Sequence, residues 1–343
     1  MDKEIEEMKE KLKTMISNQN MHMQETCGDL YGLHEFEEMN DGGKLLRGML
    51  VLLGFWMENR DIGIDNKKAE DALFLAALLE FCQTAILIQD DVIDGDRKRR
   101  GMDAMHVILE KRPLDPQRAQ VSAMLFGNIG VCYVGRLLQE RFGKNKELIK
   151  EFNDMIFVTL QGEIFDIMVP LVDKNEENRI HTQKRKDIAL EISEKKTAYY
   201  SFAAPLAMGM LLAGAKQEHR KKAKEMVSEL GVAYQLQNDL KGIRQLRIDK
   251  DLPSDMHRYK VTYINSLLAE NMEMRRILLE GAQSSDAENI MNYIERNELE
   301  DKVMKRINTA KCNFSDRINH QDMWDQERAL IFTSYINSVF DMK

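Results

Sequence analysis

The stretch ALFLAALLEFCQTAILIQDDVIDGDRKRRG, residues 72–101, leads from an almost continuous apolar segment straight into a dense cluster of charges. The apolar part, residues 72–88, is too long for a strand and predicts a buried helix. Asp90, Asp91 and Asp94 then place three carboxylates within five positions, and four basic residues follow them closely. A buried helix normally ends in a cap, so this much opposed charge requires a partner that compensates it.

The composition favours an all-α protein. Glycine (19) and proline (5) are scarce in 343 residues and methionine (23) is abundant, so turn formers are few and flexible apolar side chains are many. Helical periodicity recurs from residue 2 onward. We expect one domain over residues 1–343, a single large helical bundle around a central cavity. Charged breaks that are typical of helix connections lie near 59–68, 142–148, 173–187, 216–222 and 246–258.

Charge, cysteines and hydropathy exclude several classes. A net charge of −8 argues against nucleic acid as the main partner. Four widely separated cysteines without a C-x-x-C pair predict reduced thiols in the core of a cytoplasmic protein. The acidic start, MDKEIEEMKEKLKTM, has no signal-peptide pattern. The apolar stretches 72–88 and 198–215 are read as central helices of a soluble bundle, so we expect no transmembrane segment.

The three aspartates predict a magnesium site. On a helix, Asp90 and Asp94 are one turn apart and Asp91 lies beside them, so like charges crowd one face. A divalent cation relieves this repulsion, and hard oxygen ligands without His or Cys favour magnesium, which usually shares its ligand shell with substrate phosphates. Arg99 and Arg100 then supply planar forks for phosphate oxygens. The alternative is a solvated surface turn of mixed charge.

Other fragments fit a diphosphate site. Lys44 and Arg47 share one helix face after two glycines in GGKLLRG, residues 42–48, although a helix start with solvated basic residues has the same pattern. Lys196 and Thr197 directly precede an apolar helix, where a cation needs an anionic partner. Gln83 is a polar group on the buried helix and must be satisfied there.

Together these fragments resemble the trans-isoprenyl diphosphate synthases. The first motif of that family, D-D-x-x-D followed after four residues by R-R-G, is reproduced in full by residues 90–101. Further fragments match the family's motifs in family order: GGKLLRG at 42–48 (G-G-K-x-x-R-P), QGEIFD at 161–166 (G-Q-x-x-D), Lys196-Thr197 (K-T), YQLQNDL at 234–240 (F-Q-x-x-D-D-x-x-D) and SDMHRYKVT at 254–262 (S-D-L-x-x-G-K-x-T).

The resemblance implies an isoprenoid-synthase helical fold, a homodimer and two diphosphate substrates. Isopentenyl diphosphate would be held by Lys44, Arg47, Gln83 and Arg100. The allylic diphosphate would be held by Arg99, Lys196, Thr197, Gln235 and Lys260, with Mg²⁺ on Asp90, Asp94 and Asn238. Asp90, Asp91, Asp94, Arg99 and Lys196 would be catalytic, since cations that stabilise departing pyrophosphate let the allylic C–O bond ionise.

The sequence departs from the family in the second aspartate motif. Asn238 stands for its first Asp and Gly242 for its last, and an amide ligand without charge binds magnesium less tightly. Asn-Asp-Leu also resembles the second metal motif of class I terpene cyclases, but Gly242 and Leu246 stand where cyclases place further ligands. A terpene cyclase and a non-catalytic subunit of a heteromeric synthase are therefore the alternatives to a prenyl-elongating enzyme.

Family analogy also suggests the product length. Short-chain synthases place bulky aromatics one turn before the first motif, where this chain has Ala85 and Ile86. We therefore expect a product of geranylgeranyl length or longer, with Phe81 as the next stop and Phe157 as a competitor. The alternative is that Ala85 only allows close helix packing.

Overall fold

The computed structural model describes residues 2–28, 30, 32–41, 43–59, 67–112, 114–174, 180–249, 252–321 and 323–341. Nearly all of these residues are helical, which confirms the predicted all-α class. The chain forms two compact units, one of residues 1–152 and 205–220 and the other of residues 153–204 and 221–343. A single domain over residues 1–343 and a central cavity stay predictions.

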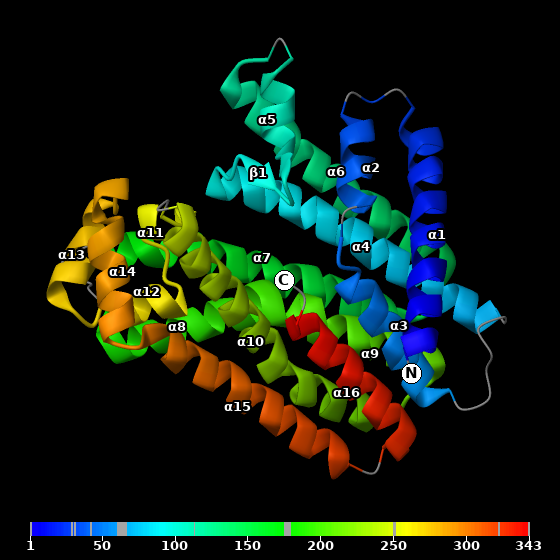
Figure 1. Ribbon diagram of the computed structural model, residues 1–343. Helices are drawn as coiled ribbons and strands as arrows, with labels where there is room; N and C mark the ends of the chain where they lie inside the picture. The colour runs from blue at the N-terminus through cyan, green and yellow to red at the C-terminus, as the bar shows by residue number, and fades with distance from the viewer. Residues whose placement is uncertain are drawn as a thin grey trace. The chain divides into compact units, whose positions relative to one another are not determined.

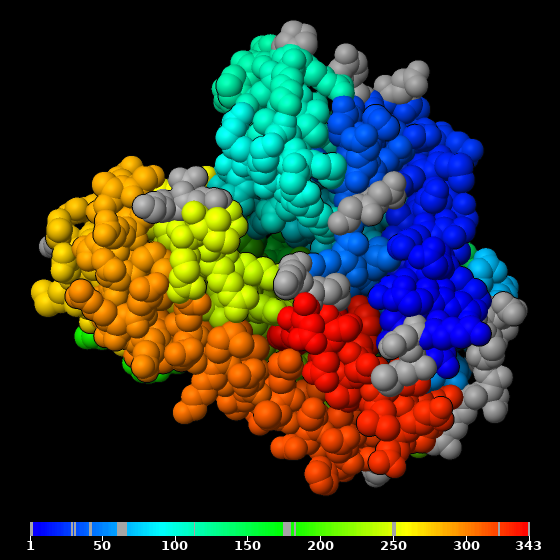
Figure 2. Space-filling model, viewed as in Figure 1, coloured from blue at the N-terminus to red at the C-terminus, as the bar shows by residue number. Residues whose placement is uncertain are grey.

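The first unit is organised around one long central helix. Helix α4 (Lys67–Asp94) packs against α6 (Pro116–Phe142), α3 (Leu46–Glu58) and α1 (Asp2–Cys27) (Figure 1). The side chains of α1 also pack against those of α2 (Leu33–Asp41), and the two form one continuous blue surface in Figure 2. The hairpin strands β1 (Lys98–Arg99) and β2 (Met102–Asp103) and helix α5 (Met105–Glu110) connect α4 to α6.

Small residues bring α4 and α6 close together. A Cβ atom placed on Gly130 of α6 would lie 2.7 Å from the Cβ of Ala85, and one on Gly127 would lie 2.8 Å from the Ala85 carbonyl oxygen. Both distances are shorter than van der Waals contact. Ala85 itself is fully buried. These contacts support the alternative in which Ala85 serves helix packing.

The second unit contains the C-terminal part of α7 (Lys146–Lys174) and most of α10 (Gln217–Asp249). Helix α8 (Thr182–Ser193) packs on α12 (Tyr263–Leu268). The remaining elements are the π-helix η2 (Glu194–Ala203), α11 (Ser254–His257), α13 (Met272–Glu280), η3 (Ser284–Asp286), α14 (Ala287–Arg296), α15 (Leu299–Asn319) and α16 (Gln326–Asp341), while α9 (Ala204–Ala213) lies almost entirely in the first unit.

Helices are separated close to three of the expected connections, between α6 and α7, α9 and α10, and α10 and α11, but residues 217–222 of the expected connection 216–222 already belong to α10. Residues 198–215 were expected to form an α-helix. Their first part instead continues a ten-residue π-helix that contains Lys196 and Thr197. Wider π turns occur frequently at functional sites, and periodicity alone does not distinguish them from α turns.

All four cysteines are free, but their placement in the core was only partly right. Cys82 is buried, whereas Cys132 and Cys312 are exposed. Both exposed cysteines lie on the outward faces of amphipathic helices, where a single small residue does not disturb the apolar pattern.

Within the described part of the chain, three helices are long and apolar enough to cross a membrane by length and composition alone. They differ in burial: the most apolar window is 72% buried in Lys67–Asp94, 44% in Pro116–Phe142 and only 28% in Lys146–Asp173. The first value confirms the predicted buried helix. The last shows that α7 exposes much of its apolar surface, and the absence of a transmembrane segment stays a prediction.

Candidate active site

The first motif lies at the C-terminal end of α4. The carboxylates of Asp90, Asp91 and Asp94 occupy its last turn, where the partial negative charge of the helix end adds to their repulsion. Arg99 offsets this charge: its Nη2 lies 3.0 Å from Asp90 Oδ2, and its Nε donates to Asp91 Oδ1 at 2.6 Å. Asp96 also lies 3.8 Å from the Arg99 guanidinium.

A tight hairpin brings Arg99 back to the helix. Arg99 pairs with Met102, and the two residues between them, Arg100 and Gly101, have φ angles of 53° and 83°. Two successive left-handed residues form the turn whose twist suits a two-residue hairpin, and glycine adopts this conformation without strain. The Gly of R-R-G is therefore explained by the turn.

Asp91 differs from its neighbours in its surroundings. Its side chain is almost fully buried, and burial raises the pKa of Asp91 to about 6 although Arg99 acts in the opposite direction. The side chains of Asp90 and Arg99 are less buried. Asp91 therefore fixes the position of Arg99. This role agrees with the prediction that Asp91 contributes to catalysis without binding the metal.

A second cluster of the first unit surrounds Glu80, a residue that the sequence analysis did not select. Glu80 accepts a hydrogen bond of 2.7 Å from the Gly48 backbone N–H. Burial raises the pKa of Glu80, while the nearby charges of Arg47 and Arg100 lower it. A Cβ on Gly43 would lie 3.4 Å from Arg100 Nη1 and 3.6 Å from Glu80 Oε2. Glu80 therefore lies within electrostatic reach of both arginines predicted for isopentenyl diphosphate.

Gly48 stands where the family motif has proline, and its contacts explain the difference. A proline has no N–H to donate to Glu80. A Cβ on Gly48 would also lie 2.6 Å from Leu12 and 3.1 Å from the Ala76 carbonyl oxygen. A carboxylate inside an apolar helix was the signal that could have revealed Glu80.

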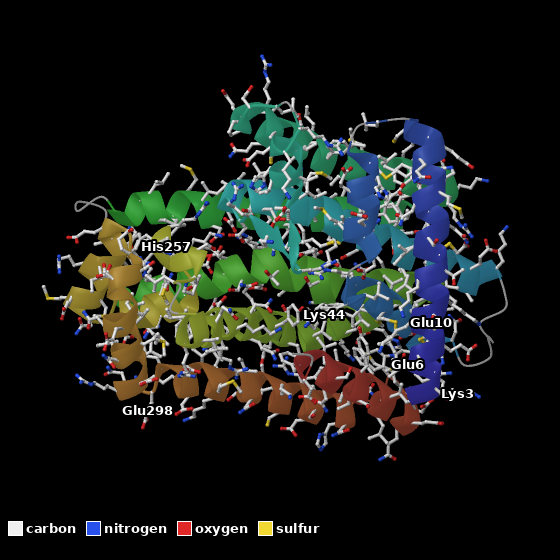
Figure 3. All side chains as sticks on the ribbon, turned by 45° about the horizontal axis from the view of Figure 1, so that its top comes forward. Lys3, Glu6, Glu10, Lys44, His257 and Glu298 are labelled. Carbon is white, nitrogen blue, oxygen red and sulfur yellow. The ribbon has the colours of Figure 1, made fainter. Side chains whose placement is uncertain are left out.

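The other predicted residues of this unit lie near the same helices. Lys44 lies two residues before the start of α3 (Figure 3). Gln83 is buried on α4, one turn after Glu80. Arg100 donates to the carbonyl oxygen of Met39 at 3.2 Å. Gly42, the first glycine of GGKLLRG, lies outside the described residues.

In the second unit, two lysines converge on one carboxylate. Lys196 Nζ lies 2.8 Å from Asp166 Oδ2 and 3.0 Å from Glu163 Oε2, and Lys260 Nζ lies 3.0 Å from Asp166 Oδ2. Burial alone would raise the pKa of Asp166, but the two ammonium groups outweigh it and hold the pKa below its ordinary value. The sequence analysis named both lysines but neither carboxylate, although QGEIFD contains both.

A glycine of α7 makes the lysine contact possible. A Cβ on Gly162 would lie 2.4 Å from the backbone nitrogen of Lys196, far inside van der Waals contact. Gly231 of α10 has the same relation to Ala198, whose Cβ would be 2.4 Å away. The backbone at Lys196 and Thr197 therefore lies directly against two helices, which sets the reach of the lysine side chain.

A hydrogen-bonded chain continues from Thr197 into the second aspartate motif. Thr197 Oγ1 donates to Gln235 Oε1 and Gln235 Nε2 donates to Asp239 Oδ1, both at 2.9 Å. Burial, followed by the charge of Asp255, raises the pKa of Asp239 to about 7. Asn238, the predicted metal ligand, is partly exposed beside Asp239. Burial and the charge of Asp255 make the ionised form of Asp239 unfavourable, so a cation bound beside this carboxylate would be stabilising.

The polyprenyl synthetase family model matches residues 35–297 of this chain. The chain belongs to the polyprenyl synthetase family. Curated relatives include farnesyl pyrophosphate synthase 1 of Parthenium argentatum, 28% identical over 262 residues (73% of this chain, 71% of the relative), and farnesyl pyrophosphate synthase of Panax ginseng, 25% identical over 285 residues (79% and 74%). Family membership confirms the predicted enzyme class, trans-isoprenyl diphosphate synthase.

Solved structures support the fold. A geranylgeranyl pyrophosphate synthase of Corynebacterium glutamicum, complexed with isoprenyl diphosphate and magnesium, has a TM-score of 0.80 at 21% identity and covers 100% of this chain and 99% of its own. A decaprenyl diphosphate synthase of Rhodobacter capsulatus has a TM-score of 0.77 at 20% identity, with 99% and 98% covered. At these identities the likeness concerns the fold alone.

Proposed function

We propose that this chain condenses isopentenyl diphosphate with an allylic diphosphate to make a longer trans-prenyl diphosphate. The observation that carries the proposal is the complete first motif, in which the hairpin holds Arg99 against Asp90 and Asp91. A synthase needs such a cluster of hard oxygen donors and cations to bind and polarise a diphosphate.

The two units supply different cationic groups. Lys196 and Lys260, which meet at Asp166, fit the diphosphate of the allylic substrate, and Thr197 and Gln235 extend that surface with polar groups. Arg47 and Arg100, whose charges act on the buried Glu80, fit isopentenyl diphosphate together with Lys44 and Gln83. Each set can neutralise a diphosphate without a protein nucleophile.

The donor sets fit magnesium. Asp90 and Asp94 would hold the ion at the end of α4, where like charges crowd, and the amide oxygen of Asn238 would serve as a weaker ligand beside Asp239. Bound Mg²⁺ would stabilise the negative charge that develops on pyrophosphate as the allylic C–O bond breaks. The chain's own part is to orient both diphosphates and to keep the reacting carbons in apolar surroundings, away from water.

A product of geranylgeranyl length or longer is the proposed outcome, since neither Ala85 nor Ile86 is aromatic. Phe81 is fully buried one turn below Ala85 and touches the rings of Phe36 and Tyr133, so it fits a floor. Phe157 is 63% exposed and does not fit one.

A second copy of the chain is the proposed cover for α7. Five large apolar side chains recur at spacings of three and four residues and are 48% to 63% exposed, which is the pattern of a helix that packs on a partner. They are Phe157, Leu160, Ile164, Met168 and Leu171. A homodimer is therefore our expectation, and a cytoplasmic location stays a prediction from the sequence.

The deciding experiment is an incubation of the isolated chain with Mg²⁺, labelled isopentenyl diphosphate and, in turn, allylic primers of five, ten and fifteen carbons. A longer diphosphate, resolved by chain length after dephosphorylation, is the expected product. Release of a hydrocarbon would instead identify a terpene cyclase. No product from any primer would favour a non-catalytic subunit of a heteromeric synthase.

A further inference from the structure

The turn that carries Lys260 has an unusual residue at its centre. Tyr259 has a φ of 59°, in the left-handed region that L-residues with large side chains rarely adopt. The S-D-L-x-x-G-K-x-T motif has glycine at this position, and glycine adopts such a φ without strain. The side chain of Tyr259 is nevertheless fully buried. Its contacts must therefore compensate for the backbone strain.

The Tyr259 hydroxyl makes two buried polar contacts. It donates to Asp173 Oδ2 at 2.6 Å and accepts from Arg185 Nη1 at 3.0 Å. The guanidinium of Arg185 also lies over the tyrosine ring, 4.5 Å from its centre. A hydrogen bond to a buried carboxylate is stronger than one between neutral groups.

Asp173 is the centre of a larger buried network. It forms an ion pair with Arg185, and both side chains are fully buried. Arg275 Nη2 and the backbone N–H of Ile180 each lie 2.9 Å from Asp173 Oδ1. Burial lowers the pKa of Arg185 to about 10, and the charge of Arg275 adds to this effect. Asp173 contacts two guanidinium groups and a backbone N–H inside the unit, so this network is a fixed anchor for the Tyr259 hydroxyl.

Lys260, the residue after Tyr259, points its ammonium group at a carboxylate of α7, the helix that also carries Asp173. Lys260 Nζ lies 3.0 Å from Asp166, and Asp166 precedes Asp173 on α7 by seven residues. Seven residues are about two helical turns, or about 10 Å, so both carboxylates face the same side. Adjacent residues of one turn thus contact two points along a single helix.

Backbone hydrogen bonds close the turn itself. The buried Asn265 donates from Nδ2 to the carbonyl oxygens of Asp255 and Lys260, both at 3.1 Å, and the Lys260 N–H donates to the Asp255 carbonyl oxygen at 2.9 Å. The turn begins after His257, which ends α11 (Figure 3). With both ends held, the direction of the Lys260 side chain depends on the conformation of Tyr259.

We propose that Tyr259 is a positioning residue: by anchoring the left-handed turn on Asp173 and Arg185, it holds the Lys260 ammonium at Asp166, where it receives the substrate diphosphate. This inference rests on the proposed function for the identity of the ligand. A glycine at position 259 would adopt the left-handed φ without strain, but it would have no side chain to anchor the turn. The direction of the Lys260 side chain would then be less well fixed.

The test measures binding of inorganic pyrophosphate with Mg²⁺ to the full-length chain by titration calorimetry. Tyr259→Phe keeps the ring over Arg185 and removes the hydroxyl, and Tyr259→Gly removes the anchor but tolerates the φ. Tyr263→Phe, which removes the hydroxyl of a partly buried tyrosine on α12, is the matched control. Circular dichroism and thermal unfolding establish that each variant is folded.

We expect Tyr259→Phe and Tyr259→Gly each to weaken pyrophosphate binding about tenfold, because a displaced Lys260 loses its charged hydrogen bond to the diphosphate and such a bond contributes about this much. Tyr263→Phe should leave it unchanged. In a Lys260→Ala background, Tyr259→Phe should have no further effect, because it acts through the lysine. The KM for the allylic substrate should rise more than the KM for isopentenyl diphosphate.

Two results would overturn the inference: affinity retained in folded Tyr259→Gly, or a tenfold loss that persists without Lys260 and so reflects general damage. A parent chain that binds pyrophosphate but forms no prenyl product would reject the proposed function while leaving the positioning effect measurable. A parent chain that binds no pyrophosphate would reject both.

Discussion

At the scale of single residues, Asp90 and Asp91 are adjacent in the chain but have different tasks. Asp91 is almost fully buried and fixes Arg99, whereas Asp90 is less buried and contacts the same guanidinium. A metal ion that binds to Asp90 and Asp94 at the end of α4 would therefore lie close to the guanidinium of Arg99, which already contacts Asp90.

Replacing Asp90 with alanine should abolish turnover by several orders of magnitude and leave the helical fold intact. The reason is that the variant loses a charged oxygen ligand at a partly buried site, without leaving a large cavity. Steady-state rates with Mg²⁺ and circular dichroism check both parts. Glu140→Ala, which removes an exposed carboxylate of α6, is the control. Near-normal activity in Asp90→Ala would contradict the assignment.

Asp239 should make metal-free stability depend on pH. Its pKa of about 7 in the folded chain exceeds 3.8, the ordinary value of an aspartate, so the folded state binds the proton more tightly than the unfolded state. The resulting stabilisation is fully present below about pH 4 and is lost as the pH rises through 7. The free energy of unfolding of Asp239→Asn minus that of the parent should therefore be larger at pH 8 than at pH 5.

Urea unfolding in EDTA at both pH values measures this difference, and adding Mg²⁺ should stabilise the parent at pH 8. A parent chain and variant with the same pH dependence would show that Asp239 ionises freely in the folded state.

At the scale of elements, close helix contacts depend on residues without side chains. Gly162 brings α7 against η2, and Gly130 brings α6 against Ala85 of α4. Helical glycines are destabilising by intrinsic propensity, so each must be repaid by the contact that it allows.

Gly162→Ala should destabilise the chain and weaken pyrophosphate binding, because the new Cβ would force the Lys196 backbone away from α7. Gly135→Ala is the matched control on α6, since a Cβ there would meet no described atom within 4 Å. That change should stabilise by up to about 1 kcal/mol through helix propensity. Thermal unfolding measures both; equal stabilisation by both substitutions would rule out the tight contact.

Ala85→Phe tests whether packing or product length governs this position. A ring has no room between Ala85 and Gly130, so we expect destabilisation of about 1–3 kcal/mol from overpacking. If the product becomes shorter, we expect the loss of stability to accompany this change, because α6 must move to make room for the ring. Ile86→Phe, at a partly buried neighbour, is the comparison. A fully stable Ala85→Phe enzyme with shorter products would favour the floor over the packing role.

At the scale of the whole molecule, the exposed apolar stripe of α7 should control assembly. Leu171→Asp places a charge on a residue that is 59% exposed, so it should break a dimer without disturbing the unit's core. Ile248→Asp, on a residue of α10 that is 75% exposed, is the control. Sedimentation velocity should show monomers for the first variant and dimers for the second. A monomeric parent, or one that floats with lipid vesicles, would contradict the homodimer.

The sequence was informative where one local pattern has one physical cause. The apolar run before Asp90 predicted α4, and R-R-G matched a hairpin that needs glycine in its turn. It was uninformative where distant residues meet. Nothing local marks Glu80 as the partner of Gly48, or Asp173 as the partner of Tyr259, since these pairs lie 32 and 86 residues apart. The π-helical segment at Lys196 also lies against Gly162 and Gly231, which come from two other helices.

The hairpin that returns Arg99 to α4 has a consequence for the order of folding. Arg99 and Asp91 are eight residues apart and joined through a two-residue turn, so their contact closes only a short loop, at little cost in chain entropy and within microseconds. The Tyr259–Asp173 contact must close a loop of 86 residues. We therefore expect the carboxylate–arginine cluster to form before the lysine turn, which awaits the slower, non-local collapse of its unit.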